Sequence, residues 1–100
     1  IRHPQVRKDA DPVWHLYVIQ TENRDILRKN LERLGIQTGI QYPVALPFLP
    51  CYQYLRHRPN DFPVRGSLQN RCLSLPIFPE ETKEQLDAVI DSILDCASIL

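Results

Sequence analysis

Residues 13–43 read VWHLYVIQTENRDILRKNLERLGIQTGIQYP, a strand–helix–strand pattern that decides the fold. Its first seven residues are rich in β-branched and aromatic side chains on both alternating faces, which predicts a strand covered on both sides. Asn23 can cap the helix that follows, and Gly35 suits the residue that ends it. The apolar positions of this helix repeat at i, i+4 and i+7: Leu27, Leu31 and Leu34. Residues 36–40 then predict a second, short strand, in which Gly39 marks a bulge or a point of close approach.

The C-terminal part of the chain adds another strand and a long helix. Residues 72–75 have strand composition, and Pro76 ends the run. Thr82 and Gln85 form a capping-box pattern at the start of the helix. The apolar residues of the helix define one broad face that we expect to be buried: Leu86, Val89, Ile90, Ile93, Leu94 and Ala97. These elements predict an α+β domain, a small antiparallel or mixed sheet of about three strands with helices packed on it.

Prolines divide the rest of the chain. Residues 41–62 contain four of them, so this stretch cannot be a continuous helix or a central strand, and we expect one helical turn near residues 52–55. Pro63 suits the first position of a short helix that continues to residue 70. Residues 1–12 are polar and contain two prolines, which predicts a linker or a cut end. The folded domain is therefore expected to span residues 13–100.

Size and composition are those of an ordinary soluble domain. One hundred residues suffice for a single core, and 43% apolar and 24% charged residues are typical of globular proteins. No apolar run approaches the roughly 20 residues that span a bilayer, and the first residues do not have the pattern of a signal peptide. We therefore expect a cytoplasmic location.

The cysteines and the charges exclude several classes of site. Three widely separated cysteines give neither a disulfide framework nor a CxxC motif, and no metal site is predicted. The formal net charge of zero argues against a general nucleic-acid binder, although residues 56–58, Arg-His-Arg, lie beside two tyrosines in a mixture that single-strand binders also use. Residues 24–71 carry a basic excess that could attract a phosphate-bearing ligand, whereas the residues from Glu80 onward are acidic.

No catalytic constellation can be assembled from local spacing. The sequence has no GxSxG, no glycine-rich phosphate loop and no HExxH. The three histidines, His3, His15 and His57, are isolated from one another. His15 lies in a predicted strand among apolar neighbours, which is more typical of a hydrogen-bonded core or interface residue than of a ligand.

Four segments in this order resemble the C-terminal part of the DegT/DnrJ family of pyridoxal-phosphate (PLP) dependent sugar aminotransferases. They are WHLYVI at 14–19, GIQTGIQYP at 35–43, DFPV at 61–64 and CLSLPIFPE at 72–80. The resemblance extends from about residue 13 to about residue 97. It implies the small domain of a fold-type-I enzyme that transfers an amino group, usually from glutamate, to a nucleotide-linked keto-sugar. It also implies an active site between a large and a small domain, at the interface of a homodimer.

The resemblance places the cofactor outside this chain. In such enzymes the lysine that binds PLP, and most phosphate contacts, belong to the large domain, so no catalytic and no cofactor-binding residue is assigned here. The lysines of this chain are consistent with that expectation. Lys8, Lys29 and Lys83 lie in polar stretches, whereas a Schiff-base lysine needs a desolvated pocket. We therefore expect the 100-residue chain alone to bind no PLP and to be inactive, although its parent is an enzyme.

The predicted substrate-binding residues are Gln41 and Tyr42, which the resemblance implies. The family commonly reads HYP at this turn, and here Tyr42 and Pro43 match while Gln41 stands in place of histidine. Glutamine donates and accepts hydrogen bonds but does not titrate near neutral pH, so a proton-shuttling role at this position is not expected. A rigid turn with the Tyr42 ring packed on the core is the alternative.

Two other functions remain open at this stage. One is a sugar dehydratase of the same family, which uses PLP or its amine form, pyridoxamine phosphate (PMP), and has histidine in place of the large-domain lysine. The other is a stand-alone binding module that kept the fold and lost catalysis. For the enzyme, the expected partners are the large domain of the same chain, a second subunit and the nucleotide-sugar. Neither nucleic acid nor a membrane is an expected partner.

Overall fold

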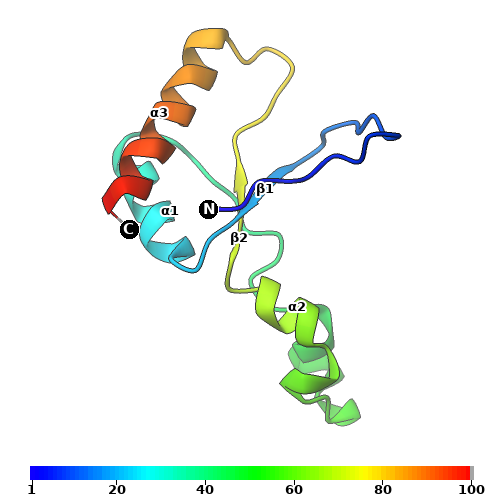
Figure 1. The fold of residues 1–100 in the computed structure, drawn as a ribbon. Helices are drawn as coiled ribbons and strands as arrows, with labels where there is room; N and C mark the ends of the chain where they lie inside the picture. The colour runs from blue at the N-terminus through cyan, green and yellow to red at the C-terminus, as the bar shows by residue number, and fades with distance from the viewer. Residues whose placement is uncertain (100) are drawn as a thin grey trace.

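Two short antiparallel strands form the centre of the computed structural model, which describes residues 1–99 (Figure 1). Strand β1 spans Tyr17–Gln20 and strand β2 spans Cys72–Leu75, with Tyr17 opposite Leu75 and Gln20 opposite Cys72. The antiparallel α+β architecture agrees with the sequence prediction, and β2 has the predicted bounds. Strand β1 is shorter than predicted because residues 13–16 diverge from the pairing, and Val13 is 97% exposed.

The predicted third strand is wrong, and the sheet has two strands. Residues 36–40 contribute a single bridge. The Gly39 N–H donates to the Ser74 carbonyl at 2.9 Å, and the Ser74 N–H donates to the Gly39 carbonyl at 2.8 Å. The Ile36 N–H donates to the Leu31 carbonyl at the end of the preceding helix. In this antiparallel register the next hydrogen-bonded pair would be Gln37 with Pro76, and Pro76 has no N–H, so pairing with β2 does not extend back toward Ile36. A similar bridge joins Arg2 to Gln20 on the other edge of β1.

Helix α1 spans Arg24–Arg33 and supplies two of the five buried residues of the core cluster. Leu27 and Leu31 are fully buried, whereas Leu34, after the last turn, is exposed. Gly35 has φ of +78°, a left-handed conformation that favours glycine and ends the helix as predicted. Asn23 occupies the N-cap position but makes no side-chain cap; its N–H instead donates to Thr21 Oγ1 at 3.3 Å.

Helix α3 spans Lys83–Ile99 and begins with the predicted capping box. The Gln85 N–H donates to Thr82 Oγ1 at 3.2 Å, and the Thr82 N–H donates to Gln85 Oε1 at 2.9 Å. The prediction of one broad buried face is wrong. Val89 and Cys96 are buried, but three apolar residues of the face are 46%, 46% and 62% exposed: Leu86, Ile90 and Leu94. We call these three residues the α3 stripe.

Residues 46–68 form a proline-rich lobe that projects from the sheet (Figure 1). It contains three short 3-10 helices, at Leu46–Phe48, Pro50–Leu55 and Pro59–Asp61, and helix α2 at Pro63–Leu68. The predicted turn near 52–55 is therefore confirmed, and α2 begins at Pro63 as expected but ends two residues early. The Gln69 side chain joins the two ends of the lobe, because its Oε1 accepts from the Ala45 N–H at 2.8 Å.

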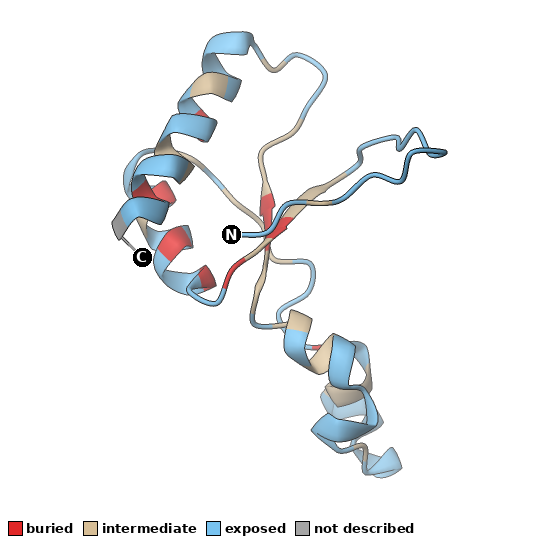
Figure 2. Cartoon of the chain, in the orientation of Figure 1, coloured by how far each residue is buried: buried red, intermediate tan, exposed pale blue. Residues whose placement is uncertain are grey.

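The core lies where α1 meets the sheet and α3 (Figure 2). Its buried members come from all four elements: Ile19, Leu27, Leu31, Leu73 and Cys96. The lobe contributes no residue to this cluster. The folded body therefore depends on a small number of aliphatic contacts.

Truncation of a core leucine should destabilise the chain strongly. Leu27→Ala is expected to lower the free energy of unfolding by roughly 2–5 kcal/mol, because Leu27 is fully buried. Leu34→Ala, at the exposed C-cap position of α1, is the matched control and should change it by less than about 0.5 kcal/mol. Urea unfolding followed by circular dichroism measures both. Equal losses for the two variants would show that the core is misassigned.

Candidate functional site

Gln41 and Tyr42 follow the Gly39 bridge, where the chain leaves the edge of β2. The Gln41 side chain folds back toward the sheet, and its Oε1 accepts a hydrogen bond from Ser74 Oγ at 2.5 Å. Ser74 itself is only 5% exposed. Gln41 is thus tied to the central strand, although it belongs to the connecting loop.

Gly39 provides the space for this arrangement. A Cβ atom at position 39 would lie 2.7 Å from Gln41 Nε2, closer than two such atoms can approach. The close approach predicted at Gly39 is therefore made by the side chain of Gln41. Any larger residue at position 39 would displace the Gln41 amide.

A hollow of about 330 Å³ lies beside this amide. Its wall combines residues from the segment before β1, the Gly39 bridge and β2, and the polar side chains among them are His15, Gln37, Thr38, Gln41 and Ser74. Apolar residues, including Leu16 and Ile77, complete the wall. The volume falls at the lower end of the roughly 300–1,000 Å³ of small-molecule sites, which likewise combine apolar walls with a few polar groups.

Tyr42 lies outside this hollow. Its side chain is 70% exposed, so the ring is not packed on the core. Its carbonyl oxygen accepts a hydrogen bond from Arg65 Nη2 at 3.4 Å, and the peptide bond between Gln41 and Tyr42 is cis. The structure therefore brings Gln41 together with His15 and Ser74 and leaves Tyr42 beside the lobe.

Two arginines of the basic segment 24–71 make hydrogen bonds or ion pairs within the fold. Arg24 is buried, and its Nε donates to Asp25 Oδ1 at 2.6 Å while Nη1 donates to the carbonyls of Gln69 and Cys72 at 3.2 and 3.5 Å. It therefore connects the start of α1 to the end of the lobe and the start of β2. Spacing along the sequence could not show this role, because its two carbonyl acceptors lie more than forty residues away.

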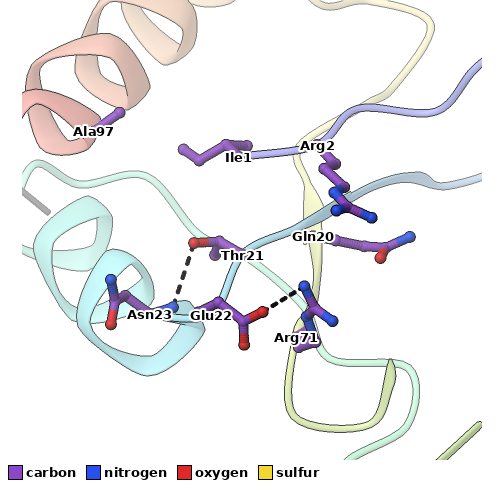
Figure 3. Close-up of a pocket in the computed structure, with 8 residues that line it drawn as sticks. All are labelled: Ile1, Arg2, Gln20, Thr21, Glu22, Asn23, Arg71 and Ala97. Atoms are coloured by element: carbon purple, nitrogen blue, oxygen red, sulfur yellow. Dashed lines mark hydrogen bonds and ion pairs between the residues drawn. The ribbon is translucent and has the colours of Figure 1, made fainter. Parts of the chain in front are cut away.

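Arg71 borders a second hollow, of about 400 Å³, on the opposite edge of β1 (Figure 3). Its guanidinium pairs with Glu22 at 2.5 Å and donates to Ser67 Oγ at 3.3 Å. The buried Nε of Arg71 has no hydrogen-bond partner within the part of the chain that the structure describes. Glu22 neutralises this arginine, whereas Arg2, which lines the same hollow, forms no salt bridge within residues 1–99.

The remaining candidate residues do not converge. Lys8, Lys29 and Lys83 are all exposed, and Lys83 forms an ion pair with Asp87. His3 is exposed, and the His57 ring packs edge-on against Phe62 with 5.0 Å between centroids. All three cysteines are free thiols. Among residues 1–99, no three His, Cys, Asp or Glu side chains are grouped as metal ligands, and no helix is long and apolar enough to cross a membrane.

Comparison with known proteins gives consistent matches over most of the chain. Residues 1–94 match the DegT/DnrJ/EryC1/StrS aminotransferase family. The chain is 42% identical over 90 residues to the erythromycin biosynthesis sensory transduction protein EryC1 of Saccharopolyspora erythraea, covering 90% of this chain and 25% of that protein. It is 38% identical over 94 residues to the dTDP-3-amino-3,4,6-trideoxy-alpha-D-glucose transaminase of Streptomyces venezuelae, covering 94% and 25%. The chain thus spans about a quarter of the length of these relatives.

Solved structures show the same fold. DesV of S. venezuelae, in complex with a ketimine intermediate, matches with a TM-score of 0.88 and 37% identity over 96% of this chain and 26% of that one. NtdA of Bacillus subtilis, solved with bound cofactor PMP, matches with a TM-score of 0.71 and 27% identity over 97% and 23%.

Replacement of Arg24 should test its structural role. Arg24→Lys retains the charge but not the fork of donors, so it should lower the free energy of unfolding by roughly 1–3 kcal/mol, because two partly buried carbonyls lose their partner. Arg28→Lys, an exposed position on the same helix, is the matched control. Thermal or urea unfolding provides the readout. Unchanged stability in Arg24→Lys would contradict a structural role for this cation.

Proposed function

Because the chain belongs to the DegT/DnrJ/EryC1/StrS aminotransferase family, we propose that it is the C-terminal small domain of an enzyme that transfers an amino group to a nucleotide-linked keto-sugar. The observation that carries the proposal is the family match over residues 1–94, together with a chain length about a quarter that of the relatives. The family inferred from the four sequence segments is confirmed. The proposal also includes a large domain, residues 1–12 as the linker to it, and glutamate as the amino donor.

The substrate class follows from the relatives. The Streptomyces venezuelae relative is named as a dTDP-3-amino-3,4,6-trideoxy-alpha-D-glucose transaminase. A second relative, 30% identical over 93 residues, is named as a dTDP-3-amino-3,6-dideoxy-alpha-D-galactopyranose transaminase of Aneurinibacillus thermoaerophilus. Both names support a nucleotide-sugar as the substrate of the enzyme proposed here.

The cofactor of the proposed enzyme is PLP, and the described residues do not fit it. PLP chemistry requires a lysine amine in a desolvated pocket, and the lysines at positions 8, 29 and 83 are all exposed. PLP would therefore be bound by the proposed large domain. The contribution of this chain is to bind and orient substrate.

In this proposal Gln41 and Tyr42 contact the nucleotide-sugar. Both residues lie at the point where the chain leaves the sheet, and Gln41 is fixed by its bond to buried Ser74. Tyr42 has a largely exposed ring that a substrate can reach, while Arg65 holds its carbonyl. Holding contacts on a rigid scaffold is what orientation of a substrate requires.

The exposed apolar surface supports a larger assembly. The α3 stripe lies on a helix that buries Val89 and Cys96, and Val13 and Trp14 are exposed before β1. Contiguous exposed apolar side chains are typical of surfaces that another domain or subunit covers. We infer that the large domain of the same chain and a second subunit of a homodimer are its partners.

The proposed reaction can be tested directly with the complete polypeptide that contains these residues. With glutamate and a dTDP-linked keto-sugar, we expect equal amounts of 2-oxoglutarate and amino sugar to form, measured by coupled assay and mass spectrometry. Formation of a dehydrated sugar without consumption of glutamate would instead support the dehydratase alternative.

Loss of the Tyr42 hydroxyl should affect substrate binding alone. In the complete enzyme, Tyr42→Phe should raise KM for the nucleotide-sugar about fivefold, the equivalent of roughly 1 kcal/mol for one hydrogen bond. The glutamate half-reaction, measured in single turnover, should be almost unchanged. Tyr54→Phe, at a comparably exposed tyrosine in the lobe, is the control. A variant that loses the glutamate half-reaction would show that Tyr42 has a different role.

The α3 stripe should cause self-association when residues 1–100 are produced alone. Sedimentation velocity at increasing concentration should show oligomers, and Ile90→Lys should reduce them because a charge interrupts the apolar surface. Glu84→Lys changes charge on the same helix outside the stripe and is the control. A monomer at every concentration would weaken the two-domain proposal.

A further inference from the structure

The hollow beside Gln41 is polar without carrying a formal charge. None of the residues that line it within the described chain is Lys, Arg, Asp or Glu, and His15 is its one ionisable side chain. Diphosphates are typically bound by arginine, lysine or the N-terminus of a helix. A ligand with neutral hydroxyl groups therefore fits this wall better than a phosphate does.

We infer that this hollow takes the sugar ring of the nucleotide-sugar, and that Ser74 positions the Gln41 amide to bind it. The inference rests on the proposed function, and it assigns to this hollow only the uncharged, hydroxyl-bearing part of the substrate. Ser74 acts through Gln41, so it is a positioning residue.

The hydrogen bond between the two side chains sets the orientation of the amide. The buried Ser74 hydroxyl donates to Gln41 Oε1, which assigns the carbonyl end of the amide to the sheet. The Nε2 group then has two N–H donors and no hydrogen-bond partner among residues 1–99. Those donors are available to accepting hydroxyl oxygens of a sugar.

Gly39 and Thr38 complete the arrangement. The absence of a side chain at Gly39 lets Gln41 Nε2 lie against the backbone, because a Cβ there would be 2.7 Å away. Thr38 and His15 add a hydroxyl and an imidazole to the same wall. These groups can donate and accept hydrogen bonds, which suits the mixed character of sugar hydroxyls. The volume of about 330 Å³ fits one ring better than a whole nucleotide-sugar.

The test compares a nucleotide-sugar with its nucleotide in the complete polypeptide. Isothermal titration with dTDP-glucose and with dTDP separates contacts to the sugar from contacts to the nucleotide. Ser74→Ala should weaken dTDP-glucose binding about fivefold, as expected for the loss of one oriented hydrogen bond, and leave dTDP binding unchanged. Unchanged dTDP binding also shows that the variant is folded. Ser98→Ala, a serine on an exposed part of α3, is the control and should change neither.

A double-mutant cycle distinguishes positioning from a separate contact. If Ser74 acts through Gln41, the variant with both Ser74→Ala and Gln41→Ala should bind dTDP-glucose no more weakly than Gln41→Ala alone. Gly39→Ala, which displaces the same amide, should reproduce the selective loss.

The possible failures are separable. Equal loss of dTDP and dTDP-glucose binding in Ser74→Ala, or additive effects in the cycle, would overturn the inference and leave the proposed function intact. If the unmodified protein binds none of dTDP-glucose, dTDP, UDP-glucose and UDP, the proposed function fails and the inference fails with it.

Discussion

The pairing of β1 with β2 is the constraint on which the rest of the structure depends. It joins residues 17–20 to residues 72–75, so the proline-rich lobe between them must begin and end near the sheet. Leu73 of β2 packs with Ile19 of β1 and the buried leucines of α1. Since the core has few members, the backbone hydrogen bonds between β1 and β2 are what keep these side chains in contact.

The same pairing creates the candidate site. Ser74 uses its backbone to bind Gly39 and its side chain to bind Gln41, and both contacts require β2 to be in place. The loop that carries the predicted substrate contacts is therefore positioned by a strand more than thirty residues away. Through these contacts Ser74, a buried residue of β2, fixes Gln41, the residue that we propose binds substrate.

Local chemistry in the sequence predicted the local structure well. The glycine at position 35 and the Thr82–Gln85 capping box each specify a helix end whose bonds close within a few residues. The composition of residues 72–75 predicted the bounds of β2, although its partner β1 is distant in the sequence. Contacts between residues far apart in the sequence were harder to predict. Helical periodicity identified the apolar face of α3, but it does not show whether this chain contains anything to cover it, and the α3 stripe is exposed. The third strand did not form because Pro76, which would pair with Gln37 in this register, has no N–H. Gln41 and Tyr42 came from a family resemblance, whereas the roles of Ser74, Arg24 and His15 depend on contacts that spacing cannot reveal.

A crystal structure of the complete polypeptide with bound dTDP-glucose is the most direct measurement of the central claim, that this chain orients the sugar of a nucleotide-linked substrate. The account predicts a sugar hydroxyl about 3 Å from Gln41 Nε2, within hydrogen-bond distance, with the Ser74 to Gln41 bond retained. A diphosphate in this hollow, or a sugar bound away from it while the large domain fills the space beside Gln41, would contradict the account.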